Sequence, residues 1–132
     1  MVVTTDGELL VAHLIGRIGY SGTPYLGCAV DIVCQILKET GSVDGINMIE
    51  SVYRPVAERF GKKVATTSRK IYRAIDCCWS KGDKEVINQI IGKPLPQKPP
   101  SREFILYCAY YLCYGVGYLS EEARHGNLPM IF

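Results

Sequence analysis

The sequence predicts a single all-α domain. Apolar residues recur at helical spacing in six segments separated by glycine- or proline-containing turns, and no segment sustains the period-two alternation of a strand. The 132 residues suffice for one domain with its own core, but not for two complete domains. With 48% hydrophobic residues and a net charge of +2, the chain is neither wholly disordered nor strongly acidic or polybasic.

Helix-start and helix-stop residues bound the predicted helices. We expect Asp6, Thr23 and Ser101 to act as N-caps, and Pro55 to kink the third helix or divide it into two short ones. The proline-rich segment 94–100 reads as an extended connector between the last two helices. The helices are expected at about 7–18, 23–39, 46–60, 66–79, 83–91 and 101–114. The helical domain then covers residues 1–114. A tail, 115–132, follows, in which residues 120–124 could form another turn or two of helix.

Residues 55–79 have the outline of a helix-turn-helix. A short helix with a small residue, Ala57, meets a glycine turn at Gly61, and a longer helix with a polar first turn follows. This segment is the candidate for DNA binding.

The predicted fourth helix is two-faced. Steps of 100° per residue from Ile71 place Arg69 and Arg73 on the opposite, outward side. Hydroxyls at Thr66, Thr67 and Ser68 would lie at the helix N-terminus, where free amides and the helix dipole suit a phosphate. A solvated helix face would carry the same residue types, so the pattern alone leaves both interpretations open. The candidate DNA-binding residues are Lys62, Lys63, Thr66, Ser68, Arg69, Lys70 and Arg73.

The run IYRAIDCCWSKGD at residues 71–83 resembles the C-terminal effector domain of the stage zero sporulation protein A family, the sporulation-initiating response regulators of spore-forming bacteria. The resemblance covers roughly residues 9–112. The order and spacing of several short motifs carry it rather than any single one. Besides that run, the matching segments are LIG at 14–16, Gly22, Tyr25-Leu26, Gly41-Ser42, Tyr53-Arg54-Pro55, Ala57-Glu58-Arg59-Phe60, Gly92 and PSREFI at 100–105.

The resemblance implies a six-helix DNA-binding domain that forms head-to-tail dimers on tandem sites in double-stranded DNA. It also implies base-edge contacts from an arginine and a glutamate at the positions that hold Thr66 and Ser68 here. Arg69 matches a family arginine, while Arg73 stands at a histidine position and Tyr72 at an arginine position. The sequence thus keeps the residues with which the family's recognition helix contacts the DNA backbone. It replaces the arginine and glutamate with which that helix contacts base edges.

That replacement keeps a second function open. A domain with the fold but without base readout would serve as a protein-interaction module that pairs with a full-length regulator. The tyrosine-rich sixth helix, uncharged from Phe104 onward, would offer a surface for this, or it would simply be buried. The family's regulators carry an N-terminal receiver domain. We expect that this sequence is either an excised effector domain or a regulator without its own phosphorylation switch.

Other chemistry has little support in the sequence. The six cysteines lie in apolar stretches without a Cys-x-x-Cys pair, so we expect buried thiols in a reducing bacterial cytoplasm rather than disulfides or a metal site. In the vicinal pair Cys77-Cys78, Cys78 is expected on the core side and Cys77 outward, as packing residues, with a redox switch as the alternative. No nucleophile–base arrangement or glycine-rich phosphate loop is present, so we expect no catalysis, no cofactor, no small-molecule substrate and no membrane contact.

Overall fold

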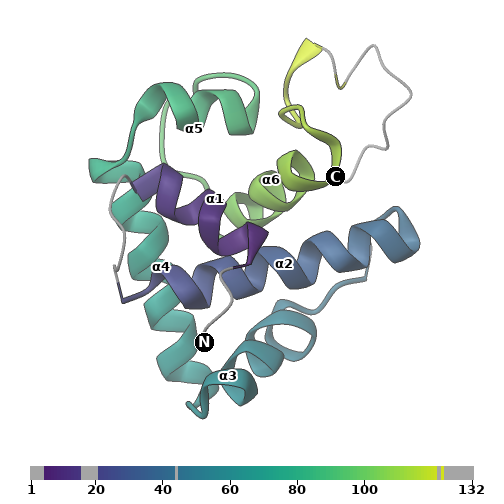
Figure 1. Cartoon of the computed structure of the whole chain (residues 1–132), viewed down its shortest axis with the longest axis vertical. Coiled ribbons are helices and arrows are strands. Elements are labelled where there is room, and N and C mark those ends of the chain that lie inside the picture. The colour runs from purple at the N-terminus through teal and green to yellow at the C-terminus, as the bar shows by residue number, and fades with distance from the viewer. Residues whose placement is uncertain (1–4, 16–20, 44, 122, 124–132) are drawn as a thin grey trace.

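The computed structural model describes residues 5–15, 21–43, 45–121 and 123. These residues form six α-helices and one π-helical segment, and none of them lies in a strand, which confirms the predicted all-α class (Figure 1). The elements are α1 (Asp6–Ile15), α2 (Thr23–Thr40), η1 (Met48–Tyr53), α3 (Arg54–Phe60), α4 (Val64–Lys81), α5 (Lys84–Ile91) and α6 (Ser101–Tyr114).

Helix α2 runs through the middle of the molecule. Its most extensive contacts are with helices α1 and α6. Helix α4 contacts both α2 and α3 (Figure 1). The buried residues of α2 include Leu26, Val30, Val33 and Leu37, which recur at helical spacing. Together with the buried centre of α6, this stripe forms the core of the domain.

Two glycines allow α1 and α2 to cross closely. A Cβ atom on Gly7 would collide with the backbone carbonyl of Gly27, and one on Gly27 would collide with the backbone of Glu8. The amide of Gly7 also donates a hydrogen bond of 2.9 Å to the Asp31 carboxylate on α2. Small residues at this crossing therefore set the position of α1.

The first predicted helix cap is wrong by one residue. Helix α1 already includes Asp6, and the capping group is the Thr5 hydroxyl, which accepts a hydrogen bond of 3.2 Å from the amide of Glu8. Both residue types are good caps, and the geometry of this turn selects the threonine. The predicted end of this helix, Ile18, lies outside the described residues.

Two further cap predictions are also wrong by one residue. Thr23 is the first residue of α2, buried at 3% exposure, and Gly22 occupies the cap position. Ser101 likewise begins α6, with Pro100 in the cap position. In both cases the polar side chain makes no capping hydrogen bond, because the chain enters the helix one residue earlier than its composition suggests.

The division of the third predicted helix is confirmed. The π-helical segment η1 ends at Tyr53, and α3 begins at Arg54, directly before Pro55. The fourth helix is longer than predicted at both ends, running over 64–81 instead of 66–79. Beyond α6, the amide of Leu119 donates to the Ile91 carbonyl, so the first part of the tail packs back on α5. Residues 121 and 123 are helical, while Arg124, at the end of the predicted tail helix, lies outside the described residues.

Candidate nucleic-acid interface

A tight glycine turn joins α3 to α4. Gly61 adopts the left-handed conformation, with φ of 65° and ψ of 36°, which a glycine reaches without steric strain. The amide of Lys62 then donates to the Ala57 carbonyl at 2.9 Å, closing the end of α3. Lys63 is extended, with ψ of 151°, and α4 starts at the next residue. The predicted helix-turn-helix is therefore present, with residues 61–63 as its turn.

An apolar stripe holds α4 against the core. Ile71 and Ile75 are buried in this stripe. Phe60 and Trp79 are half-buried at the edge of the core. The centre of the Phe60 ring lies 4.4 Å from the centre of the Tyr25 ring on α2. The residues of α4 that are buried are Thr67, Ile71, Ala74, Ile75 and Cys78.

Thr67 differs from the expectation that it offers a hydroxyl at the exposed start of the helix. Its side chain is fully buried, and its hydroxyl has no hydrogen-bond partner among the described residues. The cause is its spacing from Ile71, because a residue four positions earlier lies one helical turn before it, on the same core side of α4.

The outward side of α4 is basic. Arg69 and Arg73 are exposed and lie one turn apart, and half-buried Lys70 and Thr66 flank them. Ser68 is half-buried and lies about 100° around the helix from Arg69, on the flank opposite to Lys70, Thr66 and Arg73.

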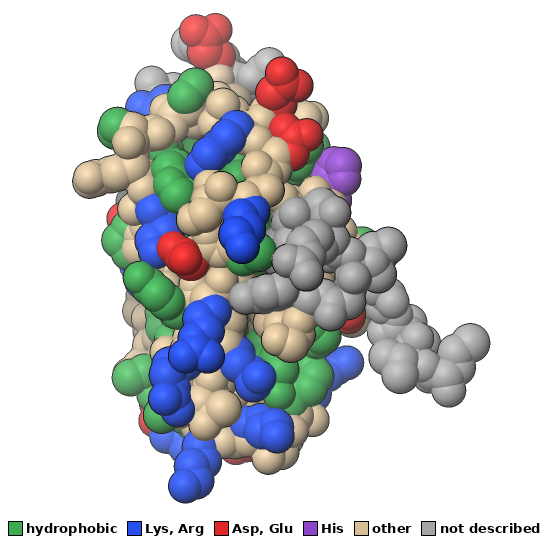
Figure 2. Space-filling view, turned by 90° about the vertical axis from the view of Figure 1, so that its left-hand side faces the viewer, with side chains coloured by type: hydrophobic (Ala, Val, Ile, Leu, Met, Phe, Trp, Pro, Cys, Tyr) green, Lys and Arg blue, Asp and Glu red, His purple; other side chains and the backbone are tan. Residues whose placement is uncertain are grey.

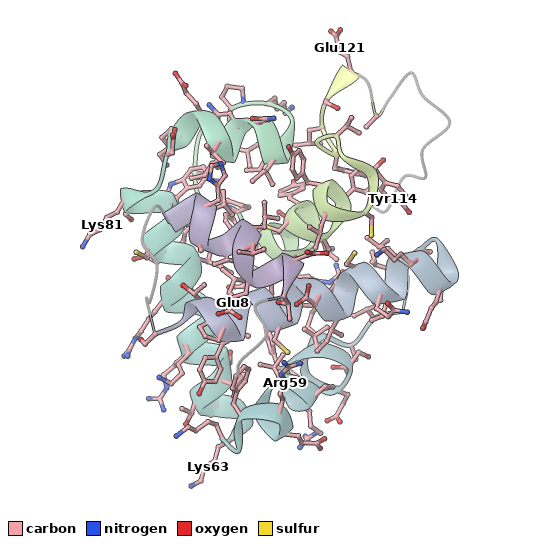
Figure 3. The ribbon with its side chains drawn as sticks, in the orientation of Figure 1. Glu8, Arg59, Lys63, Lys81, Tyr114 and Glu121 are labelled. Atoms are coloured by element: carbon pink, nitrogen blue, oxygen red, sulfur yellow. The ribbon has the colours of Figure 1, made fainter. Side chains whose placement is uncertain are left out.

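The turn before α4 extends this basic side. Lys62 and Lys63 are both exposed, and Lys63 points away from the body of the molecule at the tip of the helix-turn-helix (Figure 3). Figure 2 shows Lys and Arg side chains gathered over the lower half of this face, with acidic side chains mainly near its upper end. We call Lys62, Lys63, Arg69, Lys70 and Arg73 the basic face.

The two arginines of the basic face are not neutralised within the described part of the chain. The ion pairs found there are Arg54 with Glu50, at 2.8 Å, and Lys98 with Asp76, at 3.1 Å. Neither Arg69 nor Arg73 takes part in them. The positive charge of α4 is thus available to an external anion.

Sequence reasoning missed one contact of α4. The ammonium of Lys98, on the connector between α5 and α6, lies 3.1 Å from the Tyr72 hydroxyl and 3.1 Å from the Asp76 carboxylate. It also lies 4.3 Å from the centre of the Tyr72 ring. No local sequence pattern predicts this contact, because Lys98 is 26 residues from Tyr72 and lies in an irregular segment.

The cysteines pack as expected. Cys78 is fully buried while Cys77 is only half-buried, and burial raises the pKa of the Cys78 thiol to about 12. Burial likewise raises the pKa of Cys108, which is enclosed in α6. Within the described residues, no three His, Cys, Asp or Glu side chains are grouped as metal ligands would be.

The sixth helix is part of the core. Tyr107 and Tyr110 are buried, so at these two residues the structure supports the buried alternative rather than the partner surface. Tyr111 and Tyr114 are half-buried. No helix in the described part of the chain combines the length and apolarity that a membrane span requires.

Most of the chain matches a known protein family. The family model described as sporulation initiation factor Spo0A C terminal matches residues 11–112, more than half of the chain. The chain belongs to this family. Spo0A C-terminal domains are DNA-binding effector domains of a transcription regulator rather than enzymes. The helix-turn-helix and the basic face both lie inside the matched residues, as does Lys98.

Proposed function

We propose that this domain is a sequence-specific transcription regulator that places α4 in the major groove of double-stranded DNA. The observation that carries the proposal is the basic face, which spans the helix-turn-helix turn and the outward side of α4, and in which Arg69 and Arg73 form no ion pair with another described residue. A helix of this kind fits the major groove, and its cations replace the counterions of the phosphates.

Within this interface the residues divide by position. Lys62 and Lys63 at the tip, and Lys70 at the flank of α4, contact phosphates and set the register of the protein on the duplex. Arg69 and Arg73 face the groove floor, where an arginine pairs with the O6 and N7 atoms of guanine. Thr66 lies on the same side, one turn before Lys70 and Arg69.

Ser68 contributes from the flank of α4 rather than from its centre. Its side chain is half-buried, and a short hydroxyl there reaches a phosphate more readily than a base edge. Since Thr66 and Ser68 stand at the family's base-reading positions, the arginines carry most of the base readout, and the preferred site differs from that of the family.

The domain acts as a dimer on tandem sites and functions in the bacterial cytoplasm, where the chromosome is. Support for the dimer comes from the family resemblance, because one α4 covers only a few base pairs and two are needed for a specific site. Pairing with a full-length family regulator is the alternative.

Fluorescence anisotropy tests the proposal. The domain is titrated into a labelled duplex carrying two tandem family sites and into a scrambled duplex of the same composition, between 50 and 200 mM salt. Binding to both duplexes is expected, with affinity falling steeply as salt rises, by up to about 10³-fold for five cations. Selection from a randomised duplex pool then identifies the preferred site.

Three results separate the interpretations. A selected site bound at least about 10³-fold more tightly than random DNA supports a sequence-specific regulator. Equal, weak binding to every duplex contradicts base readout. No binding at 50 mM salt by a folded domain contradicts the whole proposal, and co-purification with a full-length family regulator would then favour the interaction module.

A further inference from the structure

The connector between α5 and α6 is tied to the outward side of α4. Lys98 donates hydrogen bonds of 3.1 Å to both Tyr72 and Asp76, and the next residue, Pro99, is buried. These two hydrogen bonds raise the pKa of Lys98, so its ammonium stays charged. The side chain of Lys98 is only 25% exposed, compared with 54% for Asp76. Lys98 is therefore held in place from both its backbone and its ammonium.

Asp76 shares α4 with the two arginines of the basic face. It is the only acidic side chain in α4 and lies one turn beyond Arg73, about 60° around the helix. When the basic face approaches DNA, an uncompensated carboxylate at this position would repel the phosphates that the arginines attract. The Lys98 ammonium offsets this charge within hydrogen-bond distance.

We propose that Lys98 is a positioning residue of the DNA interface, which neutralises Asp76 and holds Tyr72 against the connector. The inference rests on the proposed function. Lys98 acts through Asp76 rather than by contacting DNA. The α5–α6 connector is thereby a second element of the interface, in addition to the helix-turn-helix.

A double-mutant cycle tests this assignment. The affinity of the whole chain for its selected duplex is measured for the wild type, Lys98→Ala, Asp76→Asn and the double variant. Lys98→Ala is expected to weaken binding about fivefold, because it exposes the Asp76 charge. In the Asp76→Asn background the same change is expected to alter affinity less than about twofold.

Controls separate the charge effect from structure. Lys98→Arg is expected to keep wild-type affinity, and Lys93→Ala, which removes an exposed lysine from the same connector, to change affinity less than about twofold. Thermal unfolding is expected to occur at the same temperature for all variants within about 2 °C, since exposed pairs contribute little to stability.

Distinct outcomes would overturn the inference. An equal loss in both backgrounds, with the salt slope reduced by about 1, would mean that Lys98 contacts a phosphate itself. Unchanged affinity of Lys98→Ala would mean that Asp76 does not oppose binding. Either result leaves the proposed function standing, whereas a wild type that binds no duplex removes the proposed function and this inference together.

A separate observation supports a second inference, which does not depend on DNA binding. The sulfur atoms of Cys34 on α2 and Cys113 on α6 lie 2.9 Å apart, although the residues are 79 positions apart in the sequence. The Cys113 thiol also lies 3.3 Å from the Cys34 carbonyl oxygen. Both cysteines are free thiols here, and Cys113 is the more exposed of the two.

We infer that Cys34 and Cys113 form a reversible disulfide with a low-molecular-weight disulfide as oxidant. The Cys113 thiolate attacks one sulfur of the oxidant and expels a small thiolate, and the Cys34 thiolate then attacks the Cys113 sulfur and expels the second. The two protein thiols lose two electrons and two protons, which the oxidant gains as two small thiols. The bond joins the central helix to the last helix of the core.

The electrostatics of this pair predict a slow reaction. Burial and the hydrogen bond with Cys34 raise the pKa of Cys113 to about 12, so little thiolate exists at pH 7. Formation of the bond is therefore expected to accelerate as the pH rises from 7 to 9, as the thiolate fraction grows.

Intact-mass spectrometry after incubation with oxidised glutathione tests this inference. The expected product is a monomer about 2 Da lighter, with four of its six thiols still reactive after unfolding. Its melting temperature is expected to rise by about 10 °C and to return on reduction, because the bond closes a long loop. Cys34→Ser and Cys113→Ser are each expected to abolish the product, with Cys77→Ser as the control that retains it. Six unchanged thiols, or a disulfide mapped to another pair, would overturn the inference.

Discussion

Helices α4 and α6 differ in how they divide their residues between core and surface. Helix α6 buries seven consecutive residues, from Phe104 to Tyr110, so its centre is enclosed on every side. Helix α4 buries a stripe at helical spacing and leaves the basic face outside. A substitution in the middle of α6 therefore changes stability, while one on the basic face changes only binding.

The largest effect is expected at the centre of α6. Phe104→Ala removes a side chain that is 2% exposed, and it should lower the free energy of unfolding by about 3–5 kcal/mol. Urea denaturation followed by circular dichroism measures this. Arg102→Ala, at an exposed position of the same helix, is the matched control and should stay within about 0.5 kcal/mol. A loss below 1 kcal/mol for Phe104→Ala would contradict the enclosed position of α6.

The basic face should show the opposite behaviour. Arg69→Ala/Arg73→Ala is expected to weaken DNA binding by about 50-fold or more while the free energy of unfolding stays within about 0.5 kcal/mol. Anisotropy and urea denaturation on the same preparation measure both quantities. Lys81→Ala removes an exposed lysine from the far end of α4 and should leave affinity within about twofold (Figure 3). If Lys81→Ala weakened DNA binding as much as Arg69→Ala/Arg73→Ala does, the total positive charge of the domain, rather than the basic face, would govern binding.

The buried side of α4 predicts a loss of stability in alkaline solution. Burial raises the pKa of the Cys78 thiol from about 9 to about 12. The contribution of this neutral thiol to the free energy of unfolding is therefore complete below pH 9 and is lost as the pH rises toward 12. The expected loss for this thiol is about 1.4 kcal/mol per pH unit in that window. Urea midpoints between pH 7 and 11 measure it.

Cys78→Ala is the control for this pH dependence. It should cost stability at pH 7 through lost packing and yet make the alkaline decline shallower. Part of the decline should remain, because burial also raises the pKa of Cys108. An unchanged slope in Cys78→Ala would contradict the assignment of the decline to this thiol.

The smallest effect is expected at the turn between α3 and α4. Gly61→Ala places a Cβ in open space but in the left-handed conformation, so it should cost about 1 kcal/mol. Gly41→Ala, with φ of 72° and equally open space at the end of α2, should cost the same. Thermal denaturation compares the two variants. A much larger loss of stability for Gly61→Ala than for Gly41→Ala would contradict the open space around Gly61.

The sequence predicts the helices and the ends marked by left-handed glycines well. Gly41, Gly61 and Gly92 each follow a helix and each adopt a positive φ, a conformation for which glycine is the preferred residue. The helix starts at Asp6 and Thr23 are predicted less well, because several neighbouring polar residues compete for the cap and tertiary packing decides between them.

The candidate site is predictable to the extent that it is helical. Periodicity alone separates Arg69 and Arg73 from Ile71, and the structure confirms that division. The same periodicity does not reveal the Lys98 contact with Asp76, because an irregular connector has no repeating geometry from which to infer a partner. The sequence does not predict the contact between Cys34 and Cys113 either, because the packing of α2 against α6, rather than any spacing in the sequence, brings the two sulfur atoms together.

The most direct test of the central claim is amide chemical-shift mapping of the ¹⁵N-labelled domain during titration with its selected duplex. The largest shifts are expected over residues 62–73, with smaller shifts at Lys98 and little change at the centre of α6. Shifts centred on α5 or α6, or an unchanged spectrum at saturating DNA, would contradict the assignment of α4 as the DNA-binding helix.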